Sequence, residues 1–99
     1  MAKGYWIAHV TIHDPEGYKQ YIAANAAPLA EYGARFVVRS GQHESPTGNV
    51  PAGQRHVVIE FDSFEKARAC YYSHGYQAAA KIRDQYSTAS ILIIEGYAG

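Results

Sequence analysis

Three ionisable side chains stand in otherwise apolar stretches of the chain: His9, Arg39 and Glu60. A histidine titrates near neutral pH, with an ordinary pKa of about 6.5, so His9 suits a general base that moves a proton. An arginine grips a carboxylate or enolate through two parallel N–H bonds, and Arg39 would orient a substrate in this way. Glu60 lies within the run VVIEF, where a carboxylate needs a cationic partner, and it would position Arg39 or His9.

Each of these residues also has a purely structural interpretation. His9 could be a histidine whose hydrogen bonds are satisfied by its neighbours, as is usual for buried polar groups. Arg39 could form a salt bridge with Glu60 or Glu44, and Glu60 could pair with Arg39 or Arg55, because structural ion pairs use the same residue types as functional ones. The residues alone leave both interpretations open.

Metal and cofactor chemistry have little support in the sequence. His9 and His13 have a spacing that suits a metal on a helix, but their segment alternates as a strand does, and same-face residues four apart in a strand are about 13 Å apart. Cys70 is the only cysteine, which excludes a cysteine-based zinc site, and we interpret it as a small core residue. No phosphate-binding glycine loop, nucleophile elbow or CxxC motif occurs, so we expect no metal and no cofactor.

The composition predicts one globular domain over residues 1–99, because a chain of this length encloses a single modest core. Nine basic residues balance nine acidic ones, and no basic run interleaves with aromatic residues, so we expect no nucleic-acid partner. No apolar run approaches the length of about 18 residues that crosses a bilayer, and the N-terminus lacks the pattern of a signal peptide. We therefore expect no membrane association and a cytoplasmic protein.

Period-two alternation predicts strands at 5–12, 35–39 and 55–61, and the apolar run SILIIE predicts a fourth strand at 90–95. From Ser40 to Gln54 the sequence is polar and rich in turn formers. A loop of this length is unusual in a compact domain, so we expect residues 42–44 to prolong the second strand and residues 46–53 to form an exposed tip.

Two helical segments alternate with these strands. Asp14 and Pro15 are typical of a helix start, Gly33 is typical of a helix stop, and Pro28 predicts a kink or short break near residues 26–27. Asp62 and Ser63 are both capping residues, and Asp62 with Glu65 resembles a capping box. Gly75 predicts a break in this second helical segment, which then continues past Tyr76 to Tyr86.

The order β-α-β-β-α-β predicts an α+β fold: a four-stranded antiparallel sheet with its helices on one face. We assign the more apolar side of the strands to that face: Trp6, Val10, Phe36, Val38, Val57, Ile59 and Phe61. The other face then receives Tyr5, Ile7, His9, Val37, Arg39, His56, Val58 and Glu60. This mixture is too apolar for bare solvent and too polar for an ordinary core, so we expect a homodimer that encloses a partly polar cavity between two sheets.

Five short stretches also match a known family: GYWIAHV (4–10), DPEGYKQY (14–21), RFVVRSG (35–41), RHVVIEF (55–61) and YYSHGYQ (71–77), together with Arg83. In these stretches the chain resembles the family of domain of unknown function 1330. The resemblance implies a ferredoxin-like fold that pairs into a dimeric α/β barrel, and it implies no established activity. It also favours a further set of residues as the substrate-binding rim of the cavity: Glu44, Tyr71, Tyr76 and Arg83.

Two positions depart from the family pattern. Ser40 stands where the family has the first of two glycines after the arginine of the second strand, which affects the turn beside Arg39. Asp62 stands where the family has proline, which changes how the following helix is capped.

Two functional hypotheses follow. The first is a cofactor-independent enzyme, monooxygenase- or isomerase-like by analogy with other dimeric α/β barrels, that acts on a small anionic organic molecule. The second is a non-catalytic dimeric module that binds a metabolite or serves as a scaffold. A deep cavity in which His9, Arg39 and Glu60 converge would favour the enzyme, whereas a cavity filled by Tyr5, Tyr71 or the partner's side chains would favour the scaffold.

Overall fold

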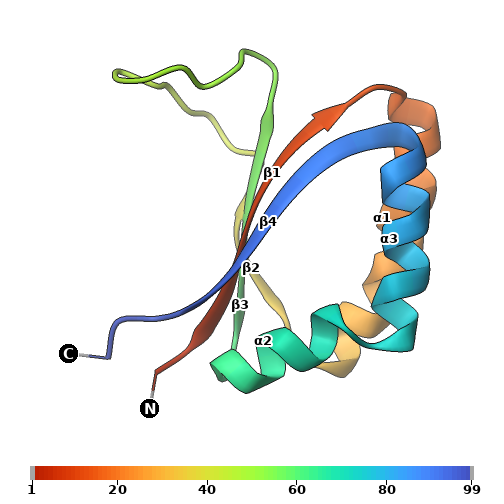
Figure 1. Cartoon of the computed structure of the whole chain (residues 1–99), viewed down its shortest axis with the longest axis vertical. Helices are drawn as coiled ribbons and strands as arrows, with labels where there is room; N and C mark the ends of the chain where they lie inside the picture. The colour runs from red at the N-terminus through yellow and green to blue at the C-terminus, as the bar shows by residue number, and fades with distance from the viewer. Residues whose placement is uncertain (1, 99) are drawn as a thin grey trace.

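The computed structural model describes residues 2–98 as a four-stranded antiparallel sheet with three helices on one face (Figure 1). The elements are β1 (Gly4–Ile12), α1 (Pro15–Glu31), β2 (Arg35–Arg39), β3 (Arg55–Phe61), α2 (Phe64–Tyr71), α3 (His74–Tyr86) and β4 (Ser87–Glu95). The strands lie side by side in the order β2-β3-β1-β4. This arrangement confirms the predicted α+β, ferredoxin-like fold.

The core lies between the sheet and the helices. Alternate residues of β1 and β3 are buried there, as the apolar periodicity predicts: Trp6, Ala8, Val10, Val57, Ile59 and Phe61. The indole Nε1 of Trp6 donates a hydrogen bond to the carbonyl oxygen of Ala67 in α2 at 2.8 Å. The rings of Phe61 and Tyr76 pack against Trp6 with centroids at 5.1 and 4.8 Å. Trp6 therefore joins the central strand to both α2 and α3.

Helix α1 begins where the sequence predicts but has no break near residues 26–27. The side chain of Asp14 accepts hydrogen bonds from the amides of Glu16 and Gly17, and the helix then continues from Pro15 to Glu31. Pro28 has no backbone N–H to donate, but it lies in the last turn of the helix. Its carbonyl oxygen accepts a hydrogen bond from the amide of Tyr32 at 3.3 Å. The predicted break was therefore wrong, because a proline this close to the helix end disturbs little of the hydrogen-bond ladder.

The second helical segment divides at Tyr72 and Ser73 rather than at Gly75. The hydroxyl of Ser73 accepts a hydrogen bond from the backbone amide of Tyr76 and caps the start of α3. Gly75 therefore lies inside the first turn of that helix. The N-cap of α2 is Ser63, whose hydroxyl accepts a hydrogen bond from the backbone amide of Lys66. The capping box predicted for Asp62 and Glu65 therefore does not form. No helix of residues 2–98 is both long and apolar enough to cross a membrane.

A bulge in β2 reverses the predicted faces of its second half. Phe36 lies opposite Ile59, but Val38 lies opposite Val58 and Arg39 lies opposite Val57. Because residues directly opposite each other share a face, Phe36 and Arg39 are on the helix side, whereas Val38 is on the other side. The predictions that placed Val38 toward the helices and Arg39 on the open face were both wrong.

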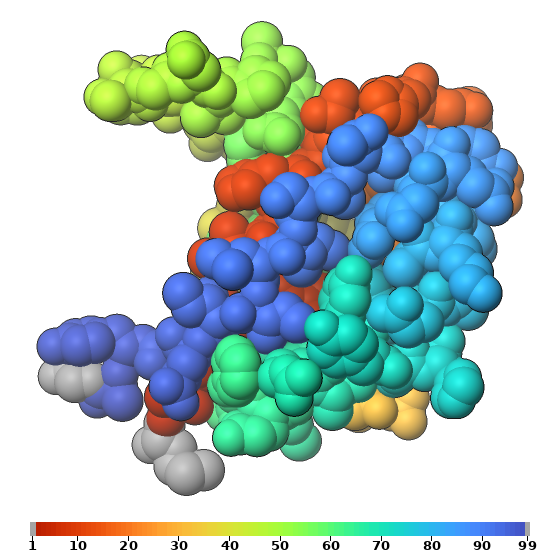
Figure 2. All heavy atoms as spheres, viewed as in Figure 1, coloured from red at the N-terminus to blue at the C-terminus, as the bar shows by residue number. Residues whose placement is uncertain are grey.

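Residues 40–54 form an extended excursion that has no helix or strand. The predicted continuation of the second strand at residues 42–44 is therefore absent, and Ser40, with a positive φ of 57°, turns the chain away after β2. This segment projects past one end of the sheet, on the side away from the helices, and residues near the C-terminus project on the same side at the other end (Figure 1). The space-filling view is hollowed between them (Figure 2).

The close approach of β1 to α2 yields a prediction at Gly4. A Cβ on Gly4 would overlap the backbone carbonyl of Ser63, the residue that caps α2. Replacing Gly4 with alanine should lower the free energy of unfolding by about 1–3 kcal/mol, because two backbones would have to separate. Gly41→Ala is the matched control, since nothing lies within 4 Å of its Cβ position. Urea unfolding at one fixed protein concentration measures both variants, and equal midpoints would contradict this packing.

Candidate functional site

A pocket lies between the sheet and the helices α1 and α3. Its protein-free space is about 460 Å³, counted with its mouth to solvent. The walls are mostly aliphatic and aromatic, with a few polar groups: Trp6, Ala8, Val10, Tyr18, Tyr21, Ile22, Asn25, Phe36, Arg55, Val57, Ile59, Tyr76, Arg83 and Ile91. Apolar walls with a few convergent polar groups are typical of sites for small organic molecules.

A chain of buried hydrogen bonds joins the two long helices beside this pocket. The hydroxyl oxygens of Tyr21 in α1 and Tyr76 in α3 are 2.6 Å apart. Arg83 lies about two turns further along α3 and donates from Nη1 to the Tyr76 oxygen at 3.0 Å. All three side chains are buried, so the guanidinium charge of Arg83 lies inside the protein.

The protonation of this chain follows from burial and charge. Burial raises the pKa of Tyr76, so its phenol is neutral at ordinary pH. Burial alone would lower the pKa of Arg83, but the interactions with Tyr76 and with the Asp84 carboxylate outweigh it, and Arg83 stays charged. Between Tyr21 and Tyr76 one hydroxyl donates to the other, so one phenolic hydrogen of the pair is left to donate to a ligand.

The pocket carries positive charge without a facing carboxylate. Arg55 and Arg83 are the charged residues that line it, and no Asp, Glu or His within residues 2–98 lines it. Burial raises the pKa of Tyr18, while the charges of Arg55 and Arg83 oppose that rise. The pocket therefore favours an anion and holds no carboxylate or imidazole to act as a general base.

The opposite face of the sheet, here called the open face, carries a histidine cluster at one end, where His9 lies opposite His56. The Nδ1 atoms of His9 in β1 and His56 in β3 are 2.8 Å apart, so one ring must donate and the other accept. The ring of His43, from the 40–54 segment, packs edge-on against His56 with centroids at 4.8 Å. Desolvation and the nearby His43 and His9 lower the pKa of His56, which favours its neutral form.

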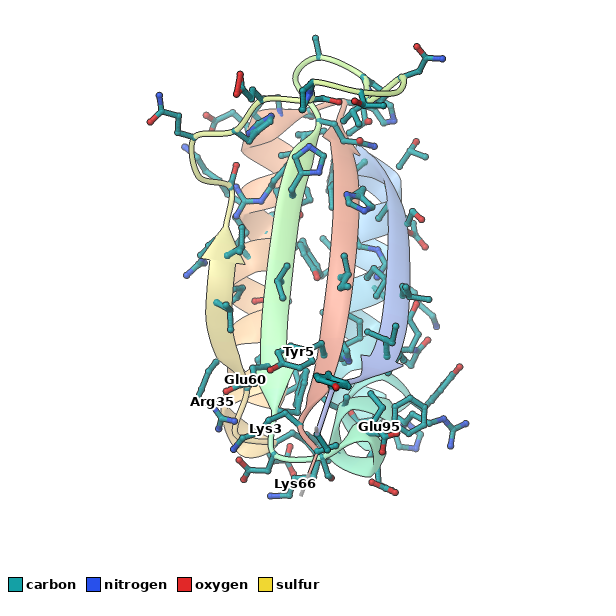
Figure 3. All side chains as sticks on the ribbon, turned by 90° about the vertical axis from the view of Figure 1, so that its left-hand side faces the viewer. Lys3, Tyr5, Arg35, Glu60, Lys66 and Glu95 are labelled. Atoms are coloured by element: carbon teal, nitrogen blue, oxygen red, sulfur yellow. The ribbon has the colours of Figure 1, made fainter. Side chains whose placement is uncertain are left out.

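A charged network occupies the other end of the open face, where Figure 3 labels Tyr5, Arg35 and Glu60. Glu60 accepts hydrogen bonds from the Tyr5 hydroxyl at 2.9 Å and from Arg35 Nε at 3.0 Å. These two bonds hold the pKa of Glu60 below its usual value. Arg35 also bonds Asp62 at 3.1 Å. The cation that pairs with Glu60 is therefore Arg35, and not Arg39 or Arg55 as expected.

His9, Arg39 and Glu60 do not converge. His9 and Tyr5, the residue opposite Glu60, are four apart on β1, which separates His9 from Glu60 by about 13 Å along the strand. Arg39 lies on the helix side, where its guanidinium stacks over the ring of Phe36 at 4.2 Å. The catalytic roles of these three residues stay predictions, and the structure supplies no common site for them within one protomer.

The residues favoured by the family resemblance fall into two groups. Tyr76 and Arg83 meet in the pocket, on the helix side of the sheet rather than on the open face. Tyr71 packs behind them, with its ring 5.2 Å from that of Tyr76 and 5.6 Å from that of Trp6. Glu44 is exposed in the 40–54 segment.

Sequence reasoning missed Tyr21 and Arg55 as pocket residues and Arg35 as the partner of Glu60. Tyr21 had a usable signal, because it shares a helical face with Tyr18 and a buried tyrosine needs a partner for its hydroxyl. Arg35 had one as well, because it precedes the bulge and its alternation with Phe36 places it on the same face as Glu60.

Neither a metal nor a thiolate is suggested by the side chains of residues 2–98. No three histidine, cysteine or acidic side chains among them cluster closely enough to hold a metal ion. Cys70 is buried, and burial raises the pKa of its thiol to about 12, so the nucleophilic thiolate is rare at neutral pH.

Comparisons with known proteins agree with the fold. The family model described as "Domain of unknown function (DUF1330)" matches residues 3–97. A protein of unknown function from Rhodopseudomonas palustris, RPA0582, superposes with a TM-score of 0.76 at 14% identity, covering 99% of this chain and 85% of that one. SnoaB, a cofactor-independent oxygenase from Streptomyces nogalater, superposes with a TM-score of 0.69 at 16% identity, covering 100% and 97%.

A third structure, from Nitrosomonas europaea, is described as a candidate antibiotic biosynthesis monooxygenase. It superposes with a TM-score of 0.66 at 13% identity, covering 97% of this chain and 91% of that one. No curated protein matches the chain by sequence. At these identities the structural likeness establishes a shared fold and nothing about activity.

The buried hydrogen-bond chain predicts unequal costs for removing its two hydroxyls. Tyr76→Phe should lower the free energy of unfolding by about 2–3 kcal/mol, because it deprives the buried Arg83 guanidinium of an acceptor. Tyr21→Phe should cost about 1 kcal/mol, because the Tyr76 oxygen can still accept from Arg83. Denaturant unfolding of both variants measures the difference, and equal or reversed costs would contradict the proposed order of the chain.

Proposed function

The chain belongs to the family of domain of unknown function (DUF1330), and we propose that it binds a small anionic organic molecule in the helix-side pocket and acts on it without a cofactor. The observation that carries the proposal is the buried chain of Tyr21, Tyr76 and Arg83 at the pocket wall. A fixed cation and a spare phenolic donor in an apolar pocket stabilise an enolate or phenolate oxygen better than water does. Tyr76 and Arg83 are thus the residues proposed to contact the reacting oxygen.

The lack of a base favours a substrate that ionises readily. Such an anion can donate electrons to O₂ directly: a CH₂ carbon beside the oxyanion becomes C=O, the second oxygen atom leaves as water, and the substrate supplies all four electrons. The shared fold has a precedent for this reaction class in SnoaB, which is described as a cofactor-independent oxygenase. An isomerase-like reaction has less support, because it needs a group that carries a proton between two carbons, and the pocket holds no carboxylate or imidazole within residues 2–98.

Proton transfer by His9 and positioning by Glu60 remain a separate proposal. Both side chains are on the open face, which the sheet separates from the pocket within one protomer. Those roles, and a substrate contact by Glu44, therefore require a cavity formed between two copies of the chain. Arg39 fits the first site better, because it stacks on Phe36, which lines the pocket.

We also propose that the open face pairs with that of a second copy to form a homodimer. Apolar side chains on this face are left in solvent: Val38 is 40% exposed, Leu92 55% and Ile94 42%. The face is concave and bounded by two projecting segments (Figure 2), which suits a facing sheet better than a flat partner. Exposed apolar patches of this kind commonly mark interfaces. We propose a cytoplasmic location for this homodimer.

The alternative is a module that binds a metabolite without turnover. Its support is the lining of the pocket, in which no Asp, Glu or His within residues 2–98 is present to act as a general base. Ligand binding that persists without any chemical change in the ligand would identify this alternative.

Readily ionised phenols and 1,3-dicarbonyls provide a test of the enzyme. With such compounds the protein should consume O₂, and Tyr76→Phe and Arg83→Lys should each slow this by about 100-fold, because each disrupts the hydrogen-bond chain that supplies donors to the developing oxyanion. An oxygen electrode follows turnover, and fluorescence of Trp6, the only tryptophan, follows binding, since it lines the same pocket.

Glu60→Gln is the matched control, because it alters the open face and leaves the pocket untouched. Its activity should equal that of the unaltered protein. Loss of activity in Glu60→Gln together with full activity in Tyr76→Phe would move the reaction to the open face. Binding of these compounds without O₂ uptake would refute the enzyme and support the non-catalytic binding module.

The dimer proposal is tested at Val58, which lies at the centre of the open face, opposite Ile7 and Val38. Val58→Asp should convert a dimer into a folded monomer, because the interface would have to bury an unpaired carboxylate. Ala69→Asp, at an exposed position on α2, is the control and should stay dimeric. Analytical ultracentrifugation decides the matter: a monomeric unaltered protein at micromolar concentration, or a Val58→Asp dimer of unchanged affinity, would refute the interface.

A further inference from the structure

We infer that Arg55 is a carboxylate anchor, so that the ligand of the pocket is a small organic acid whose carboxylate lies at Arg55 and whose other end points to Tyr76. This inference rests on the pocket proposed above as the binding site. Arg55 begins β3 and lies opposite Val10, which places it on the helix-facing side, and it lines the pocket. Its Nε atom is shielded from solvent and has no hydrogen-bond partner within residues 2–98.

The unpaired Nε sets Arg55 apart from the other arginines of the chain. Arg35 bonds Glu60 and Asp62, and Arg83 bonds Tyr76 and Asp84. Arg39 and Arg68 stack on aromatic rings. A buried N–H without an acceptor is costly, so such a group in a folded protein usually meets a ligand or an ordered water. For Arg55 the missing acceptor has to come from outside the described residues.

A carboxylate is the acceptor that best fits this position. Its two oxygens match the parallel N–H groups on one edge of a guanidinium, which an amide or an alcohol cannot do. Arg55 and Arg83 supply two positive charges to an apolar pocket that holds no acidic lining residue within residues 2–98. Arg39, stacked on the pocket residue Phe36, adds a third charge nearby. Attraction between unlike charges is strong where little water screens it.

The remaining walls define the rest of the ligand. Between Arg55 and the Tyr76 hydroxyl the lining is mostly aliphatic and aromatic, which suits an unsaturated or aromatic body. The spare phenolic hydrogen of the tyrosine pair suits a hydroxyl or carbonyl oxygen at the far end. A space of about 460 Å³, mouth included, suits a small organic body. The expected class is therefore hydroxy- or oxo-carboxylic acids of that size.

Benzoate and benzamide are suitable probes, because they have nearly the same shape and differ in charge. Fluorescence of Trp6 reports their binding without any need for turnover. The unaltered protein should bind benzoate at least about tenfold more tightly than benzamide, as expected for a charge-assisted pair of bonds. Arg55→Gln should bind the two equally, and Arg55→Lys, which keeps the charge but not the fork, should fall between.

Arg68→Gln is the control for the loss of one positive charge, because Arg68 is exposed on α2 and stacks on Tyr72, away from the pocket. It should keep the full preference for benzoate. Circular dichroism establishes whether each variant is folded. If Arg55→Gln does not fold, the comparison is made with Arg55→Lys instead.

Each outcome separates the anchor from the wider proposal. A preference for benzoate that survives in Arg55→Gln, or its absence in the unaltered protein while benzamide still binds, would overturn the anchor and leave the pocket as a binding site. Failure of both probes to bind the folded protein would overturn both. Benzoate binding that depends on Arg55, in a protein without oxygenase activity, would support the anchor and refute the enzyme.

Discussion

The arrangement of this protein depends on one buried charge. The guanidinium of Arg83 lies inside the protein, and a charge in that position destabilises the fold unless it is paired and hydrogen-bonded. Its partners come from its own helix, through Tyr76 and Asp84, and from α1, through the contact of Tyr76 with Tyr21. The two long helices are thereby held together at a fixed separation over the sheet. An apolar contact has no preferred direction, whereas the 2.6 Å bond between the Tyr21 and Tyr76 hydroxyls requires a definite distance and angle.

This arrangement gives the two faces of the sheet different chemistry. On the helix side, positive charge is enclosed by aromatic and aliphatic walls, and few carboxylates oppose it. On the open face, charges are already matched within the chain, as Glu60 is by Tyr5 and Arg35, and the histidines pair with each other. An unmatched charge attracts a ligand, and a matched one mainly fixes local geometry. The same fold can therefore offer one face to a small molecule and the other to a second copy.

Much of the fold could be predicted from the sequence because it depends on local patterns. Alternation located β1 and β3, and Asp14 and Gly33 marked the ends of α1. The site was harder to predict. The bulge in β2 moves Arg39 to the helix side without any glycine or proline to mark it, and the antiparallel register places Arg35 rather than Arg39 opposite Glu60. The pairing of Tyr21 with Tyr76 joins residues 55 positions apart, and only packing of α1 on α3 brings them together.

The bulge between Phe36 and Val38 also has a consequence for how related chains can diverge. The bulge holds one residue more than the facing stretch of β3, so deleting Val37 would restore a regular ladder and leave Val38 opposite Val58 and Arg39 opposite Val57. If β2 instead formed a regular ladder with all five residues kept, Val37 would lie opposite Val58, and Arg39 would move to the open face with the histidines. The loss of a single codon at the bulge would thus keep positive charge on the helix side, whereas a change of register without any deletion would transfer it to the other face.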